Sequence, residues 1–191
     1  MKSSVRIVIS GLPGSGKTFS ILKIIELLEG DGFSIGGMVT LPILEEGRRV
    51  GYYIENWATK EKEIFAHISY TNSKIKYGKF GVMLSVLEGI GVASLEYALQ
   101  NNDLVVIDEV GIVQVESDIF ADEVRNVIKS DKPFVITIHK KSRHPLLQEI
   151  RRKDDVRILE VTAVNVKILP FKVLNIFHTD ESYKNDSNKI Q

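Results

Sequence analysis

Short apolar runs alternate along the chain with segments in which apolar residues recur every three or four positions. The apolar runs predict strands at residues 5–10, 33–40, 49–54, 63–69, 104–107, 133–139, 156–161 and 171–176. The three-to-four spacing predicts helices at residues 19–29, 92–101, 118–130 and 145–152. Gly30 is placed to end the first of these helices, and Ser117 to cap the third. Alternating strands and helices are typical of a parallel sheet covered on both faces, so the pattern predicts an α/β fold.

Residues 33–85 interrupt this alternation. The strands expected at 33–40 and 49–54 are separated by a turn-forming segment at 45–47, which predicts a β-ribbon. Residues 70–81 are polar and contain several lysines, and we expect a loop there. No linker divides the sequence. We therefore expect one domain at residues 1–178, with an insertion at about 33–85, and a polar, frayed tail at 179–191.

A glycine-rich loop lies between the first expected strand and the first expected helix. It reads Gly11-Leu12-Pro13-Gly14-Ser15-Gly16-Lys17-Thr18 and matches G-x-x-x-x-G-K-[ST] at every position. Glycines let backbone N–H groups wrap a phosphate chain at the positive end of a helix. Lys17 would add a charge for the β and γ phosphates, and Thr18 a hydroxyl for Mg²⁺. The loop predicts a nucleotide site with Mg²⁺ as its cofactor.

A second motif follows an apolar strand and ends in two carboxylates. It reads Leu104-Val105-Val106-Ile107-Asp108-Glu109 and continues with Val110-Gly111. Because ligands bind beyond the carboxyl ends of parallel strands, we expect Asp108 to approach the glycine loop and to hold Mg²⁺ through a water. Glu109 would orient and deprotonate an attacking water. The alternative is that both acids begin a solvated turn.

The adjacent glutamate is typical of the additional-strand ATPase class resembling RecA, and it favours hydrolysis. In that class the strand expected at 133–139 lies between the other two motif strands. Its end would carry a polar side chain that senses the γ-phosphate, either Thr137 or His139. The alternative for a threonine in a strand is packing.

Composition narrows the remaining classes of function. The 25 basic and 25 acidic residues balance, so nucleic-acid binding would need a local patch. The absence of cysteine excludes disulfides and cysteine-ligated metal centres. No apolar run is long enough to span a bilayer, and we expect a soluble, cytoplasmic protein without a membrane partner. The oligomeric state is left open.

Several sequence blocks in their order resemble the nucleoside-triphosphatase family of thermophiles, which includes the human cancer-related nucleoside triphosphatase. The blocks are residues 11–18, 32–38 leading to 49–52, 77–82 and 106–111. The resemblance implies a RecA-like P-loop fold and hydrolysis of ATP, GTP and other nucleoside triphosphates with loose base selectivity. The chain departs from the family pattern after Gly111 and at Asn165-Val166, where an Asn-Arg pair is usual.

Other roles stay open. Candidates for a cation that stabilises the transition state lie both in the insertion and later in the chain: Arg48, Arg49, Lys74, Lys76, Lys79, Arg143, Arg151 and Arg152. Each is also typical of a solvated surface charge. Four aromatic residues of the insertion are candidates for stacking a base or for packing: Tyr52, Tyr53, Trp57 and Tyr77. The alternative functions are a nucleotide or small-molecule kinase and a nucleotide-switched binding protein.

Overall fold

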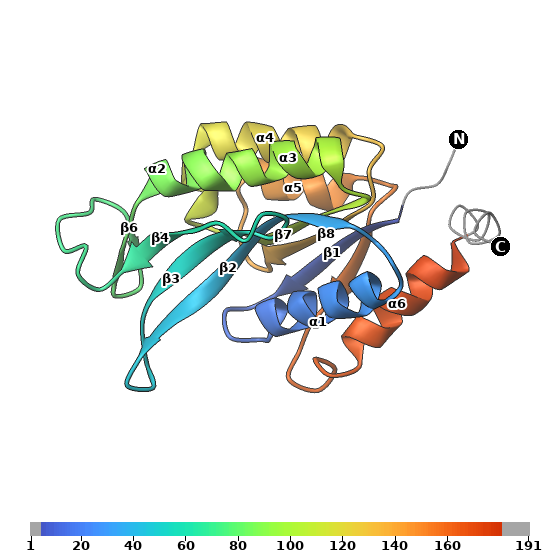
Figure 1. The fold of residues 1–191 in the computed structure, drawn as a ribbon, viewed down its shortest axis with the longest axis horizontal. Coiled ribbons are helices and arrows are strands. Elements are labelled where there is room, and N and C mark those ends of the chain that lie inside the picture. Colours follow the sequence, from blue (N-terminus) through green and yellow to red (C-terminus); the bar gives the residue numbers. More distant parts are fainter. Residues whose placement is uncertain (1–4, 181–191) are drawn as a thin grey trace.

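The computed structural model describes residues 5–180 as a sheet between two layers of helices (Figure 1). The strands are β1 Arg6–Gly11, β2 Ile35–Glu45, β3 Arg48–Asn56, β4 Lys62–His67, β5 Lys76–Tyr77, β6 Phe80–Val82, β7 Leu104–Val110, β8 Phe134–His139 and β9 Arg157–Glu160. The helices are α1 Lys17–Gly30, α2 Leu84–Val86, α3 Val92–Asn101, α4 Asp118–Lys129, α5 Pro145–Arg152 and α6 Leu169–Thr179. A π-helical turn at Leu87–Gly91 joins α2 to α3, and a 3₁₀ turn at Gln114–Glu116 precedes α4.

All these strands belong to one sheet, in the order β5-β6-β4-β3-β2-β7-β8-β1-β9. The five strands β2, β7, β8, β1 and β9, which are neighbours in this order, run parallel. Strand β8 lies between β1 and β7, as the sequence predicts. The remaining pairs are antiparallel. The expected β-ribbon is therefore present, and it extends the parallel sheet instead of forming a separate one. The sheet as a whole is mixed.

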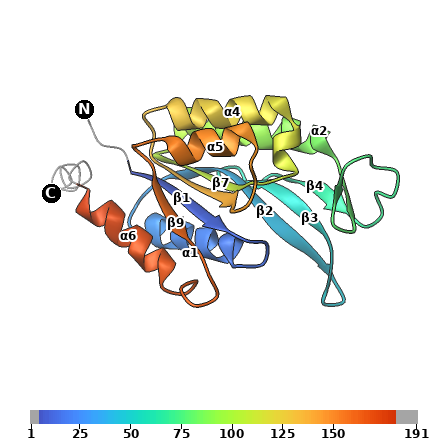
Figure 2. The same ribbon diagram turned by 180° about the vertical axis from the view of Figure 1, so that it is seen from behind.

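Helices cover both faces of the sheet, which confirms the predicted α/β fold. Figures 1 and 2 show α1 and α6 on one face and α3, α4 and α5 on the other. Successive side chains of β1 alternate between these layers: Ile7 and Ile9 pack with α1 and α6, and Val8 packs on the opposite side. The two hydrophobic cores fix the carboxyl ends of β1, β7 and β8 at the same edge.

The predicted strand at 171–176 is wrong, because this segment lies within helix α6. Leu169, Val173 and Phe177 recur every fourth residue and are buried against the α1 side of the sheet, whereas Phe171 is 49% exposed. Pro170 occupies the first turn, where its missing N–H costs little. The apolar composition suited a strand, but the helical spacing is the one that buries the apolar face.

Smaller differences concern loops and boundaries. The segment expected as a loop at 70–81 contains β5 and the start of β6. Helix α1 ends at Gly30 as predicted, but the backbone reverses at Gly32, which has a φ of 90°. Ser117 does cap α4, since its side chain accepts a hydrogen bond from the N–H of Phe120. Among residues 5–180, no helix combines the length and apolar character needed to cross a bilayer.

Replacing Phe177 tests the helical assignment of α6. We expect Phe177→Ala to lower the free energy of unfolding by about 3 kcal/mol, because it removes a fully buried aromatic ring. Phe171→Ala, on the exposed side of the same helix, should cost less than about 1 kcal/mol. Urea unfolding of both variants gives the comparison. Equal losses would contradict the assignment.

Candidate active site

The glycine loop connects β1 directly to α1, and its glycines are required by geometry. Gly14 and Gly16 have φ values of 76° and 95°, which disfavour residues with a side chain. A Cβ on Gly16 would also lie 2.5 Å from Cγ2 of Val166. A Cβ on Gly11 would lie 2.3 Å from Oγ of Ser15. The backbone therefore approaches its neighbours too closely for other residues.

The start of α1 offers donors for an anion. Among residues 5–180, no side chain caps this helix, so its first N–H groups are available to a phosphate. The side chain of Lys17 is 6% exposed. Its Nζ lies 3.3 Å from the carbonyl oxygen of Gly11, 3.2 Å from that of Leu12 and 3.1 Å from Oε2 of Glu109. The ammonium thus sits beside the loop and beside the second acidic residue of the β7 motif.

Asp108 is 1% exposed and is held by threonines from three other elements. Thr18 on α1 donates to one carboxylate oxygen at 2.6 Å, and Thr137 on β8 donates to the other at 2.6 Å. Thr40 on β2 donates to the backbone carbonyl of Asp108 at 2.7 Å. Burial raises the pKa of the Asp108 carboxyl from 3.8 to about 6, although both side-chain hydrogen bonds oppose this shift.

A register shift explains how two consecutive acids face the same space. In a regular strand, neighbouring side chains point to opposite faces of the sheet. The pairing between β7 and β8 is interrupted between Ile107 and Val110, where Asp108 and Glu109 lie. Such irregularities re-aim side chains beside active sites. Both carboxylates therefore line one cavity.

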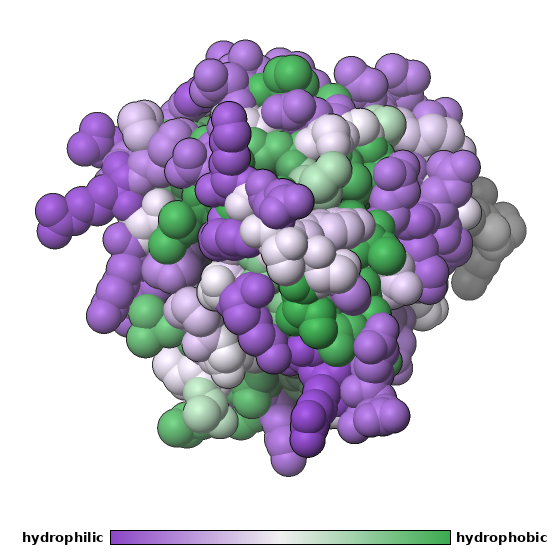
Figure 3. Space-filling model, turned by 90° about the vertical axis from the view of Figure 1, so that its left-hand side faces the viewer, coloured by the Kyte–Doolittle hydropathy of each residue, from purple (hydrophilic) through white to green (hydrophobic). Residues whose placement is uncertain are grey.

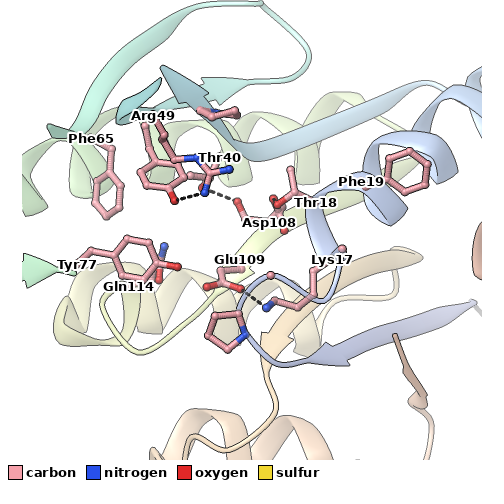
Figure 4. Close-up of a pocket in the computed structure, with 15 residues that line it drawn as sticks. Lys17, Thr18, Phe19, Thr40, Arg49, Phe65, Tyr77, Asp108, Glu109 and Gln114 are labelled. Atoms are coloured by element: carbon pink, nitrogen blue, oxygen red, sulfur yellow. Dashed lines mark hydrogen bonds and ion pairs between the residues drawn. The ribbon is translucent and has the colours of Figure 1, made fainter. Parts of the chain in front are cut away.

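This cavity has a volume of about 320 Å³. Its walls are Pro13, Gly14, Gly16, Lys17, Thr18, Phe19, Thr40, Pro42, Arg49, Tyr52, Phe65, Tyr77, Asp108, Glu109 and Gln114 (Figure 4). The glycine loop and α1 form one side, and the ribbon of β2 and β3 with β5 forms the other. Figure 3 shows this end of the molecule, at the left of Figure 1, with hydrophilic side chains around a more hydrophobic middle.

The structure brings part of the predicted site to this cavity: Pro13, Gly14, Gly16, Lys17, Thr18, Asp108 and Glu109 line it, whereas Gly11, Leu12 and Ser15 of the loop do not. Thr137 contacts Asp108, but the ring of His139 accepts a hydrogen bond from the N–H of Lys141 and does not line the cavity. Buried residues of β7 fill the sheet and its two cores: Leu104, Val105, Val106, Ile107 and Val110. Buried Gly111 lies close behind Glu109, because a Cβ there would be 2.6 Å from its Oε1.

Several of the weaker candidates have other partners. The guanidinium of Arg151 donates to backbone carbonyls of His139, Lys140 and Ser142. The indole of Trp57 donates to Glu29 and stacks with Lys60. Arg49, Tyr52 and Tyr77 do line the cavity.

Sequence reasoning missed Phe19, Thr40, Pro42, Phe65 and Gln114 as cavity residues. Thr40 carried one usable signal, since it is a polar residue just after Val39, the last β2 residue that pairs with β7. Phe19 directly follows the glycine loop, whereas Pro42, Phe65 and Gln114 reach the cavity only through the path of the ribbon and the loop after β7, which no local motif predicts.

A family model described as NTPase matches residues 6–174 of the chain. The chain belongs to this NTPase family. Relatives called nucleoside-triphosphatase THEP1 include one from Thermoplasma volcanium, 36% identical over 93% of this chain and 99% of its own length. Another, from Methanosarcina acetivorans, is 40% identical over 91% of this chain and 97% of its own. The predicted resemblance is confirmed.

Two solved structures of the family share this fold. The crystal structure of THEP1 from Aquifex aeolicus superposes with a TM-score of 0.76 at 30% identity, covering 90% of this chain and 98% of that one. The solution structure of a human cancer-related nucleoside triphosphatase gives 0.74 at 26% identity, covering 92% and 99%. The family's P-loop architecture thus extends over nearly all of the chain.

The buried carboxyl of Asp108 makes stability depend on pH. The pKa of this carboxyl is 3.8 in the unfolded chain and about 6 in the folded chain. Between these two pH values, the folded chain therefore binds more protons than the unfolded chain. The free energy of unfolding should therefore fall as the pH rises from about 4 to about 6 and then stay level. Asp108→Asn removes this cost and should stabilise the protein by about 1–3 kcal/mol at pH 7.5 without Mg²⁺ or nucleotide.

Urea unfolding at several pH values measures this effect. The gain from Asp108→Asn should vanish near pH 4, where the carboxyl is protonated in both states. Asp131→Asn, at an exposed position, is the control and should show no such trend. A variant at Asp108 that is less stable than the wild type at pH 7.5 would contradict the expected cost of burial.

Proposed function

We propose that the chain is a Mg²⁺-dependent nucleoside-triphosphatase that hydrolyses ATP, GTP and other nucleoside triphosphates to the nucleoside diphosphate and inorganic phosphate. The observation that carries this proposal is the pair of Lys17 and Glu109, 3.1 Å apart in one cavity beside the glycine loop. Membership of the NTPase family supports the reaction class. The relatives' names specify nucleoside triphosphates without a base, which supports broad base selectivity.

Binding of a triphosphate changes the contacts of Lys17. Phosphate oxygens beside the N-terminus of α1 would compete with Glu109 for the ammonium, since charge-assisted contacts to phosphate are strong. Lys17 would then neutralise the β and γ phosphates. The Glu109 carboxylate would lose its ion pair and become available to accept a proton from water.

The reaction follows from this arrangement. A water oxygen forms a bond to the γ-phosphorus while the bond from that phosphorus to the β,γ-bridging oxygen breaks. The electron pair of the broken bond leaves with the nucleoside diphosphate, and a water proton passes to Glu109. The first N–H groups of α1 and the ammonium of Lys17 hold the phosphate chain in place during the step.

The residues present suit a magnesium ion. Thr18 and Asp108 offer a hydroxyl and a carboxylate whose oxygens are 2.6 Å apart, and Mg²⁺ prefers hard oxygen donors. Among residues 5–180, no three His, Cys, Asp or Glu side chains cluster as ligands. Water and phosphate oxygens would complete the coordination, as is usual for nucleotide-bound Mg²⁺. When bound, the ion would neutralise phosphate charge.

Steady-state release of phosphate tests the proposal. We expect inorganic phosphate and the nucleoside diphosphate in equal amounts from ATP, GTP, CTP and UTP. We expect no release of phosphate when EDTA removes Mg²⁺. Turnover of a single triphosphate would contradict the broad selectivity. Transfer of the γ-phosphoryl group to an added hydroxyl compound would instead support a kinase, and binding without repeated turnover would support a switch.

A further inference from the structure

The cavity contains a second cation opposite the glycine loop. Of the residues that line it, Lys17 and Arg49 are the two with positive charges. Figure 4 shows Arg49 across the cavity from Lys17, with Asp108 and Glu109 between them in this view. Within residues 5–180, no carboxylate oxygen lies within 4.0 Å of the Arg49 guanidinium, whereas Arg125 is paired with two acids. Among these residues, no ion pair therefore neutralises the charge of Arg49.

An irregularity in β3 directs Arg49 toward the cavity. Ile43 pairs with Gly51 and Leu44 pairs with Arg49, so β3 has one extra residue, Val50, at this point. Arg49 and Tyr52 are three residues apart and would face opposite sides of a regular strand. The extra residue of a β-bulge reverses the alternation and brings both to the same side. Both side chains do line the cavity.

Tyr52 holds the guanidinium in position. Nη1 of Arg49 donates to the Tyr52 hydroxyl at 2.9 Å, and the guanidinium carbon lies 5.4 Å from the centre of the ring. The ring of Tyr52 is itself fixed by edge contacts with Tyr77 and with buried Phe80, at centroid distances of 5.7 and 5.3 Å. These contacts occupy one nitrogen of the guanidinium and leave other N–H groups for a ligand.

We propose that Arg49 is a catalytic residue that contacts the γ-phosphate oxygens from the side opposite Lys17 as the triphosphate is cleaved. The inference rests on the proposed function and adds the source of the transition-state cation. Negative charge builds up on the equatorial and bridging oxygens while the water attacks, so a second cation facing Lys17 stabilises that state more than the bound substrate. The same molecule supplies this arginine, and no second copy is needed.

The test compares Arg49→Ala with Arg48→Ala: both side chains are exposed, but Arg48 lies outside the cavity. We expect kcat for ATP to fall by about 10²–10³-fold in Arg49→Ala. The affinity for ADP should remain within about threefold of the wild type, because ADP lacks the γ-phosphate. Arg48→Ala should match the wild type in both. Arg49→Lys should recover part of kcat, since lysine keeps the charge but loses the planar fork.

Two further readouts separate chemistry from folding. Added guanidinium ion should restore part of the turnover of Arg49→Ala, and the variant should fail to form a tight complex with ADP and aluminium fluoride while still binding ADP. Wild-type kcat in Arg49→Ala would overturn the assignment and leave the proposed function standing. If Arg49→Ala lost as much affinity for ADP as it lost in kcat, the assignment would also be overturned, because Arg49 would then bind the ground state of the nucleotide and not the transition state. Absence of hydrolysis in the wild type would overturn both proposals.

Discussion

Glu109→Gln should reduce kcat for ATP by about 10²–10⁴-fold while nucleotide binding persists. Glutamine keeps the size of the side chain but cannot accept a proton from water. The Glu109 side chain is 16% exposed, and the proposed mechanism replaces its ion pair with Lys17 by phosphate contacts when a triphosphate binds. Loss of the negative charge should therefore leave the dissociation constant for ATP unchanged or lower it.

Phosphate release and equilibrium binding of ATP, measured on the same preparation, separate these effects. Glu116→Gln is a suitable control, because Glu116 is exposed in the 3₁₀ turn that follows the same strand. It should behave as the wild type. Full turnover by Glu109→Gln would show that another group activates the water.

Lys17→Ala should lose binding and turnover together. Its ammonium is the one buried cation beside the loop among the residues described here, and it contacts two loop carbonyls and Glu109. Removing a charged donor to phosphate should weaken ATP binding by about ten- to a hundredfold and slow the chemical step by about 10²–10³-fold. This combined loss distinguishes Lys17 from Glu109, for which only turnover should fall.

Isothermal titration with ATP and single-turnover kinetics with excess enzyme measure the two losses. Lys17→Met keeps most of the buried stem and should show the same losses with less disturbance of packing. Lys23→Ala, on the same helix but 34% exposed, is the control and should be neutral. Retention of both binding and turnover in Lys17→Ala would contradict the role of the loop.

The sequence was most informative where a function depends on contiguous residues. The glycine loop and the acids after β7 are local motifs, so their positions and their convergence at one sheet edge could be predicted from Gly11 to Thr18 and from Asp108 alone. The order of β1, β8 and β7 followed from the class that Glu109 indicated, and the structure has that order.

The remaining features depend on packing and register. The single-residue irregularities at Val50 and at Asp108-Glu109 turn side chains toward the cavity, and no residue pattern marks them. Helix α6 was predicted as a strand because its apolar residues suit either element, and burial against α1 decides between them. The choice between Thr137 and His139 likewise needed the structure, since residues two apart share a face of a strand and only the contacts show that Thr137 reaches Asp108. Its role as a sensor stays a prediction.

The destination of the γ-phosphoryl group tests the central claim most directly. ATP labelled at the γ-phosphorus is incubated with the protein and Mg²⁺ in water enriched in ¹⁸O, and the products are analysed by mass spectrometry. Hydrolysis by water predicts one new ¹⁸O atom in each inorganic phosphate and one ADP for each phosphate. Label that remains in ATP, or that moves to another molecule or to the protein without release as phosphate, would contradict the account.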